Sequence, residues 1–190
     1  MANETLQVLK LLIESKGEKL SIRGISKLRN VNYKTAYNAV KNLEKEGAVK
    51  LERLGNTINC SFAYKLIPLV YEAEYERRGE FLKNKDIRVL MKKLDSLLFP
   101  LIALIFGSFA KKRAASISDI DLLVVCEKER IEEVESMISL LPLRIHLTVF
   151  TPREFMKMAK SKEFSVVSEA MKNNVILIGI EDYYRMVEHV

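Results

Sequence analysis

Apolar residues recur at two different spacings along the chain, and the spacing separates helices from strands. The helical spacing of three to four positions occurs in three early segments, 4–14, 21–29 and 33–46. Gly17 should end the first helix, Asn32 should cap the third and Gly47 should stop it. Residues 48–62 instead alternate roughly between apolar and polar side chains around a glycine turn, which predicts a β-hairpin.

The segment 66–84 is expected to connect this part to the rest of the chain. It predicts a helix from about Pro68 to Arg78 that ends at Gly79, with Tyr71 and Tyr75 on one face. Such a segment usually serves as a spacer that packs on its own protein. A homodimer contact through this helix is the alternative.

From residue 85 onward, apolar runs of strand length alternate with amphipathic helical segments. The expected strands are 101–106, 119–125, 143–150 and 175–178. This alternation predicts a small mixed sheet covered by helices. The whole chain is therefore predicted to be an α+β protein with an N-terminal domain at 1–65 and a C-terminal domain at 85–190.

The basic charge of the chain is concentrated in its first third. Residues 1–65 hold 12 Lys and Arg against 6 Asp and Glu, whereas residues 66–190 hold 19 of each kind. A local positive excess favours a polyanionic partner for that region alone. The third helix supplies a polar face for such a partner: Tyr33, Lys34, Tyr37, Asn38 and Lys41.

The order of three short helices and a hairpin resembles a winged helix-turn-helix domain. In that family the third helix seats its apolar side in the domain and presents its polar side to the major groove. The segment from Thr35 to Val49 is similar to the recognition helix and the start of the wing. The resemblance implies that residues 1–65 bind double-stranded DNA. A solvated helix face, or a winged domain that binds protein, is the alternative.

A second pattern lies between the first two strands of the C-terminal domain. Gly107-Ser108 follows the first apolar run, and ten residues later Asp119 and Asp121 open the next one. Residues two apart on a strand point to the same face, with about 6.6 Å between their Cα atoms. Gly107 permits close approach of the backbone, and the basic stretch 111–113 offers charge for an anion. Paired carboxylates beside a phosphate site suit metal-assisted phosphoryl or nucleotidyl transfer.

This combination resembles the nucleotidyltransferase superfamily of DNA polymerase beta, and within it the minimal nucleotidyltransferases. The resemblance implies that Asp119 and Asp121 hold two Mg²⁺ ions. It also implies that Gly107, Ser108 and Lys111 bind the phosphates of a nucleoside triphosphate. The chain departs from the family at Lys112, where members usually carry Gly.

The family pattern also asks for a third carboxylate on a later strand, and this chain does not show one there. By alternation, the polar face of the strand 143–150 carries Arg144, His146 and Thr148, and Glu154 lies beyond it on a predicted helix. His146 is therefore a candidate general base, since its ordinary pKa suits that task. An exposed histidine that only forms a hydrogen bond is the alternative.

Composition and the remaining motifs bear on the cellular location and on the possible functions. Cys60 and Cys126 fit no metal-ligand spacing, and a reducing cytoplasm is the simplest interpretation. The N-terminus lacks the pattern of a secretory signal, and the apolar run 97–106 is shorter than the roughly 20 residues that span a membrane. Two functions stay open: a DNA-binding nucleotidyltransferase, and a transcriptional regulator whose degenerate transferase domain senses nucleotide. A third, the antitoxin-like role of some minimal nucleotidyltransferases, follows from the resemblance alone.

Overall fold

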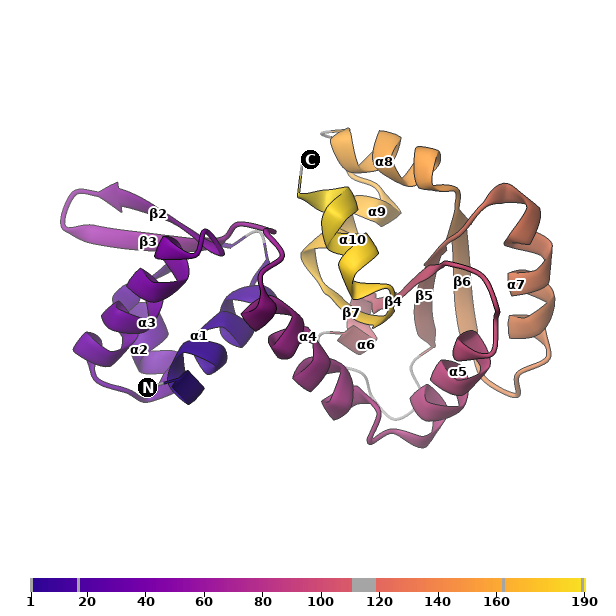
Figure 1. The fold of residues 1–190 in the computed structure, drawn as a ribbon, viewed down its shortest axis with the longest axis horizontal. Helices are drawn as coiled ribbons and strands as arrows, with labels where there is room; N and C mark the ends of the chain where they lie inside the picture. Colours follow the sequence, from indigo (N-terminus) through magenta and orange to yellow (C-terminus); the bar gives the residue numbers. More distant parts are fainter. Residues whose placement is uncertain (1, 17, 111–118, 162, 189) are drawn as a thin grey trace. The chain divides into compact units, whose positions relative to one another are not determined.

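The chain is an α+β protein that forms two compact units, Met1–Glu76 and Arg77–Val190 (Figure 1). The structure is a computed structural model that describes residues 2–16, 18–110, 119–161, 163–188 and 190. Within these ranges, no helix combines the length and the apolar character needed to cross a bilayer.

The described residues of the first unit form three complete helices, the larger part of a fourth, and a small antiparallel sheet with the strand order β1-β3-β2. Its elements in chain order are α1 (Ala2–Glu14), β1 (Leu20–Ser21), α2 (Ile22–Arg29), α3 (Tyr33–Lys45), β2 (Val49–Leu54), β3 (Thr57–Phe62) and the first part of α4 (Pro68–Phe81). The predicted order of three helices and a hairpin is thus confirmed. The expected helix end at Gly17 lies outside the described residues.

Local signals determine where these elements begin and end. The Asn32 side chain accepts a hydrogen bond from the Thr35 N–H at 2.8 Å, and Ser21 caps α2 in the same way from the Gly24 N–H. Gly47 follows α3 with φ of 81°, and Gly55 forms the hairpin turn with φ of 59°, both in the left-handed region that favours glycine. Asn32, Gly47 and Gly55 act as the sequence predicted, whereas the cap at Ser21 was not predicted.

The helix α4 corrects one prediction. Gly79 does not end it, because the helix continues to Phe81. A glycine inside a helix costs only about 1 kcal/mol relative to alanine. Tertiary contacts outweigh that cost: Phe81 packs against the core of the second unit, and Arg78 donates a hydrogen bond to the Leu177 carbonyl at 2.9 Å.

The second unit is built on a four-stranded mixed sheet with the order β6-β5-β4-β7. The strands are β4 (Ile102–Phe106), β5 (Ile120–Val125), β6 (Ile145–Phe150) and β7 (Asn174–Ile178). Strand β4 pairs antiparallel with both β5 and β7, whereas β5 and β6 are parallel. The helical elements are α5 (Lys85–Asp95), α6 (Gly107–Ala110), the 3-10 turn η1 (Lys128–Arg130), α7 (Ile131–Ser139), α8 (Pro152–Lys160), α9 (Val166–Lys172) and α10 (Ile180–Val187).

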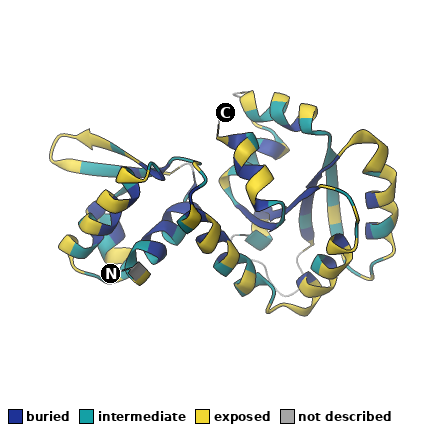
Figure 2. Ribbon diagram, viewed as in Figure 1, coloured by how far each residue is buried: buried dark blue, intermediate teal, exposed yellow. Residues whose placement is uncertain are grey.

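Alternation along β5 separates the two faces of this sheet. Ile120, Leu122 and Val124 are buried in one apolar cluster with residues of α5 and α7. Figure 2 shows that buried residues are concentrated in the central strands of this unit. Asp121 therefore lies on the opposite face, at the beginning of the strand. Helices α8, α9 and α10 pack against the sheet outside that cluster, through β6 and β4. The predicted small mixed sheet is confirmed.

Both cysteines are buried and neither forms a disulfide. Burial raises the pKa of the Cys60 thiol to about 11, and it also raises the pKa of Cys126. A thiol with a raised pKa stays protonated near neutral pH and is a poor nucleophile. The two cysteines therefore act as small core residues.

Candidate nucleotide site

Two antiparallel strands bring the motif residues together at one end of the sheet. Phe106, the last residue of β4, pairs with Asp121 near the start of β5. Gly107 and Ser108 follow at once in α6, and Asp119 directly precedes β5. Gly107 is buried, whereas Ser108 and Asp119 are exposed. The expected phosphate ligand Lys111, with the rest of the segment 111–118, lies outside the described residues.

Gly107 leaves room for the carboxylate of Asp121. Its φ of 69° lies in the left-handed region, and a Cβ placed there would be 2.3 Å from Asp121 Oδ2. Any other residue would displace the carboxylate or shift the strand end. The glycine is thus required by the position of Asp121 as well as by the turn.

His146 lies on the other side of the same carboxylate. The parallel ladder pairs Asp121 with His146, and His146 Nδ1 is 3.4 Å from Asp121 Oδ1. The His146 side chain is 75% exposed and that of Asp121 is 28% exposed, so solvent and solutes reach the pair. Asp121 therefore has one oxygen toward Gly107 and the other toward the imidazole.

The other side chains considered for the third acidic position do not reach Asp121 by pairing. Thr148 pairs with Leu123, further along β5, and Arg144 precedes β6. Glu154 belongs to the cap of α8: its carboxylate accepts hydrogen bonds from the Thr151 N–H at 2.9 Å and from the Thr151 hydroxyl at 2.8 Å. These bonds hold the pKa of Glu154 below its ordinary value. The strand register thus singles out His146.

The donor set fits a divalent ion that shares its ligands with a substrate. Mg²⁺ in proteins is usually held by one or two carboxylates, with waters and substrate phosphates completing its shell. Asp119 and Asp121 can supply the carboxylates. Among the described residues, no three His, Cys, Asp or Glu side chains gather closely enough to form a metal site by themselves.

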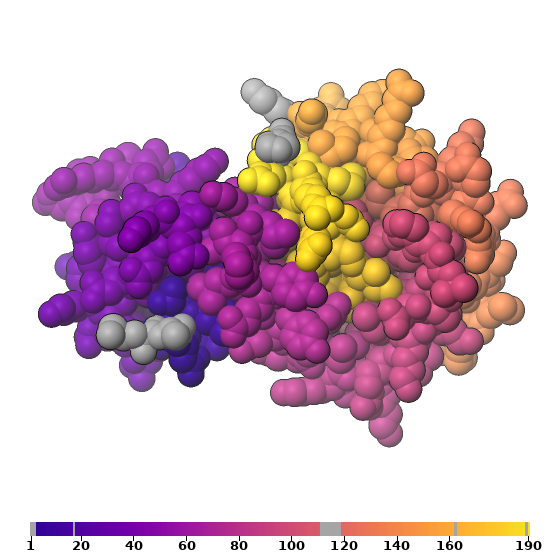
Figure 3. Space-filling model, in the orientation of Figure 1, coloured from indigo at the N-terminus to yellow at the C-terminus, as the bar shows by residue number. Residues whose placement is uncertain are grey.

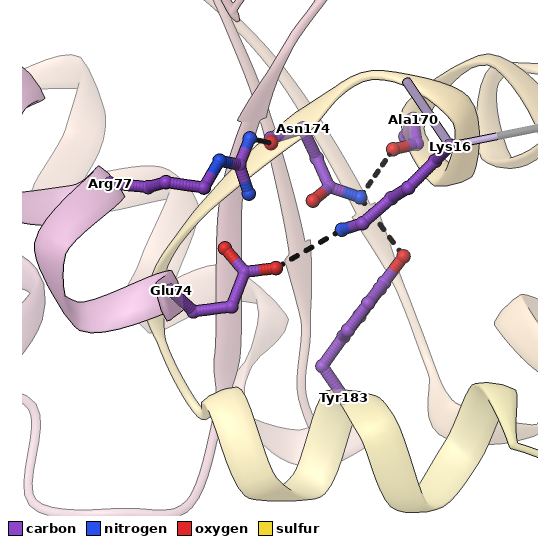
Figure 4. A network of polar contacts seen from close by, with 6 residues as sticks. All are labelled: Lys16, Glu74, Arg77, Ala170, Asn174 and Tyr183. Carbon is purple, nitrogen blue, oxygen red and sulfur yellow. Dashed lines mark hydrogen bonds and ion pairs between the residues drawn. The ribbon is translucent and has the colours of Figure 1, made fainter. Parts of the chain in front are cut away.

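A buried polar network holds the strand end that carries Gly107. Asn174 pairs with Phe106 across β7 and β4, and its side-chain amide donates to the Ala170 carbonyl at 2.6 Å and to the Tyr183 hydroxyl at 2.9 Å (Figure 4). Arg77 donates to the Asn174 backbone carbonyl at 2.7 Å. The sequence did not predict the role of these residues. Arg77 falls in the segment interpreted as a connector, and Asn174 lies just before the predicted strand 175–178, where no pattern marks it as a supporting residue.

A pocket in the second unit lies at the opposite end of the same strands. It has a volume of about 370 Å³, and its lining includes Leu101 and Ile102 at the start of β4 and Val125 and Cys126 at the end of β5. None of the motif residues lines it. The pocket is therefore separate from the candidate nucleotide site.

The candidate DNA-contacting residues all lie on the outer side of α3. Tyr33, Lys34, Asn38 and Lys41 are exposed and Tyr37 is half-buried, whereas Ala36, Val40 and Leu43 face the core. The rings of Tyr33 and Tyr37 stack with 6.3 Å between their centroids. Lys41 forms an ion pair with Glu44 on the same helix. Figure 3 shows side chains of α3 and of the hairpin on the surface of the first unit.

Comparison with known proteins assigns the second unit. The family described as "Polymerase beta, Nucleotidyltransferase" matches residues 79–182, which include Gly107, Asp119, Asp121 and His146. No curated protein and no solved structure shows a significant match to the chain. The matched segment covers more than half of the sequence and contains the whole strand–turn–strand motif. The chain therefore belongs to the polymerase beta nucleotidyltransferase family.

Proposed function

We propose that this protein binds DNA through its first unit and a nucleoside triphosphate, with a divalent metal ion, through its second. The observation that carries the nucleotide assignment is the position of Gly107 at the end of β4, so close to the Asp121 carboxylate that no Cβ would fit, inside the segment that matches the family. The reaction class is nucleotidyl transfer to an acceptor hydroxyl.

In this proposal each motif residue has one task. Asp119 and Asp121 bind the divalent ion, Mg²⁺ being the ion that the family resemblance implies. When bound, that ion neutralises charge on the nucleotide phosphates. Gly107 and Ser108 orient the phosphates through the backbone N–H groups and the hydroxyl, and Lys111 adds positive charge. Catalysis then depends mainly on positioning and charge stabilisation.

In this proposal the first unit binds DNA as a winged helix-turn-helix domain. Its three helices and hairpin occur in the order that this family uses, and α3 turns its polar side outward. The positive balance of residues 1–65 favours a phosphate backbone as the partner. Lys34 and Lys41 would contact phosphates, while Tyr33, Tyr37 and Asn38 would contact the backbone or base edges.

Replacing Lys34 with Ala in the full-length chain should weaken DNA binding and reduce its dependence on salt. Each lysine that neutralises one phosphate contributes about one unit to the slope of log K against log salt. Lys41→Ala should have a smaller effect, because Lys41 already pairs with Glu44. Fluorescence anisotropy with labelled duplex DNA at several salt concentrations measures both slopes.

The matched control is Lys92→Ala, which removes the same charge from the exposed side of α5 in the second unit. It should leave the slope unchanged. If Lys92→Ala reduced the slope as much as Lys34→Ala, the binding surface would not be α3.

A second candidate function is nucleotide sensing with little transfer, and His146 favours it. His146 lies beside Asp121, where the family pattern asks for a third carboxylate. An imidazole cannot replace the negative charge of a carboxylate next to bound metal and phosphate. We therefore expect slow transfer by the wild type with Mg²⁺ and a rise of roughly 10²–10⁴-fold in His146→Asp. The measurement is mass spectrometry of the protein and of candidate acceptors after incubation with each nucleoside triphosphate.

Thr148→Asp is the control for this experiment, because Thr148 pairs with Leu123 and not with Asp121. It should not raise transfer. Rapid transfer by the wild type that is lost in His146→Ala would instead identify His146 as the general base and would reject the sensing function.

A further inference from the structure

His146, which lies beside Asp121, adds a nitrogen ligand to a site whose other protein ligands are carboxylate oxygens. His146 Nδ1 and Asp121 Oδ1 are 3.4 Å apart, and the parallel pairing of β5 with β6 holds the two residues side by side. An all-carboxylate site offers only hard oxygen ligands, whereas this pair offers one oxygen and one imidazole nitrogen. Imidazole suits Zn²⁺ and similar transition ions, while carboxylates and water suit Mg²⁺.

We propose that Asp121 and His146 together make this site select a transition ion of the Zn²⁺ or Co²⁺ type over Mg²⁺. The inference rests on the proposed function, because it concerns the metal position of the same nucleotide site. Water and nucleotide phosphate would complete the shell, because the described residues contain no group of three His, Cys, Asp or Glu side chains that could hold an ion. Transition ions also bind a given nitrogen and oxygen site more strongly in the order that places Co²⁺ and Zn²⁺ above Mn²⁺.

The test uses the full-length protein and Co²⁺ as a probe that reports its own ligands. Co²⁺ binding is followed by visible absorption and by the hyperfine-shifted imidazole N–H signal in proton NMR, with Mg²⁺ as the competitor. Wild type should show the imidazole signal and a strong preference for Co²⁺. In His146→Asp the signal should vanish, and the preference for Co²⁺ over Mg²⁺ should fall by about tenfold or more.

The second histidine of the chain provides the matched control. The sequence contains only two histidines, so His189→Ala leaves His146 as the single source of an imidazole signal. This variant should keep both the signal and the preference of the wild type. Loss of the signal in His189→Ala, or its persistence in His146→Asp, would overturn the inference.

The experiment distinguishes failure of this inference from failure of the proposed function. An equal ratio of Co²⁺ to Mg²⁺ affinity in wild type and His146→Asp would reject selection by His146 while leaving the nucleotide site intact. Failure of both ions to bind wild type and His146→Asp, with and without nucleotide, would reject the proposed metal-dependent function and this inference together.

Discussion

Replacing Asp119 and Asp121 together with Asn should abolish metal-dependent nucleotide binding while leaving DNA affinity unchanged. Asn keeps the size of the side chain but removes the charge that attracts a divalent ion. Loss of a residue that only supports a metal ligand typically costs about 10–100-fold in metal affinity, and loss of two direct ligands should cost more. Calorimetric titration with a nucleoside triphosphate in the presence and absence of the metal measures the effect.

The control is the double variant Asp86→Asn with Asp95→Asn. Both residues are exposed on α5 in the same unit, so the net charge changes equally without touching the motif. This variant should bind nucleotide as the wild type does. Equal binding by wild type and the Asp119 and Asp121 variant would remove the two carboxylates from the proposed site.

Gly107→Ala should produce the second large effect, through the position of Asp121. The added methyl would lie 2.3 Å from the Asp121 carboxylate oxygen, so the carboxylate must move away from its place beside His146. The left-handed backbone adds strain of about 1–2 kcal/mol. We expect a loss of nucleotide affinity on the order of 10–100-fold, as for other disturbed metal ligands, measured by the same titration.

Gly55→Ala separates backbone strain from displacement of the carboxylate. Gly55 also has a positive φ, of 59°, but an added Cβ there meets nothing within 4 Å. This variant should lower the free energy of unfolding by about 1–2 kcal/mol and keep full nucleotide affinity. If Gly107→Ala lost only stability and kept nucleotide affinity, its contact with Asp121 would have no role in binding.

Local patterns in the sequence predicted the elements with local causes. The cap at Asn32, the helix end at Gly47 and the glycine turn at Gly55 are determined by neighbouring residues, and the structure confirms them. The two-residue strand β1 was missed because it is too short to show a period. The end of α4 was misplaced because packing in the second unit, which no local pattern records, outweighs the preference of Gly79.

The candidate site was only partly visible in the sequence for the same reason. Spacing placed Gly107 near Asp119 and Asp121, and alternation placed His146 on a polar face. Alternation cannot say which residue of β6 lies beside Asp121, since that depends on the register between two strands separated by α7. The support from Asn174 depends on a partner strand still further along the chain.

The pairing of β7 with β4 has a consequence for how the protein is made. The strand that supports the Gly107 end of β4 leaves the ribosome after the other described strands, because β7 follows all of them in the sequence. Contacts between residues so far apart in sequence form slowly, since a long loop must close first. A growing chain that ends before Asn174 therefore lacks the contacts that fix Phe106 and Gly107. Under the proposed function, competence to bind nucleotide should therefore arise only after Asn174 has emerged, later than the first unit, which precedes it in the chain.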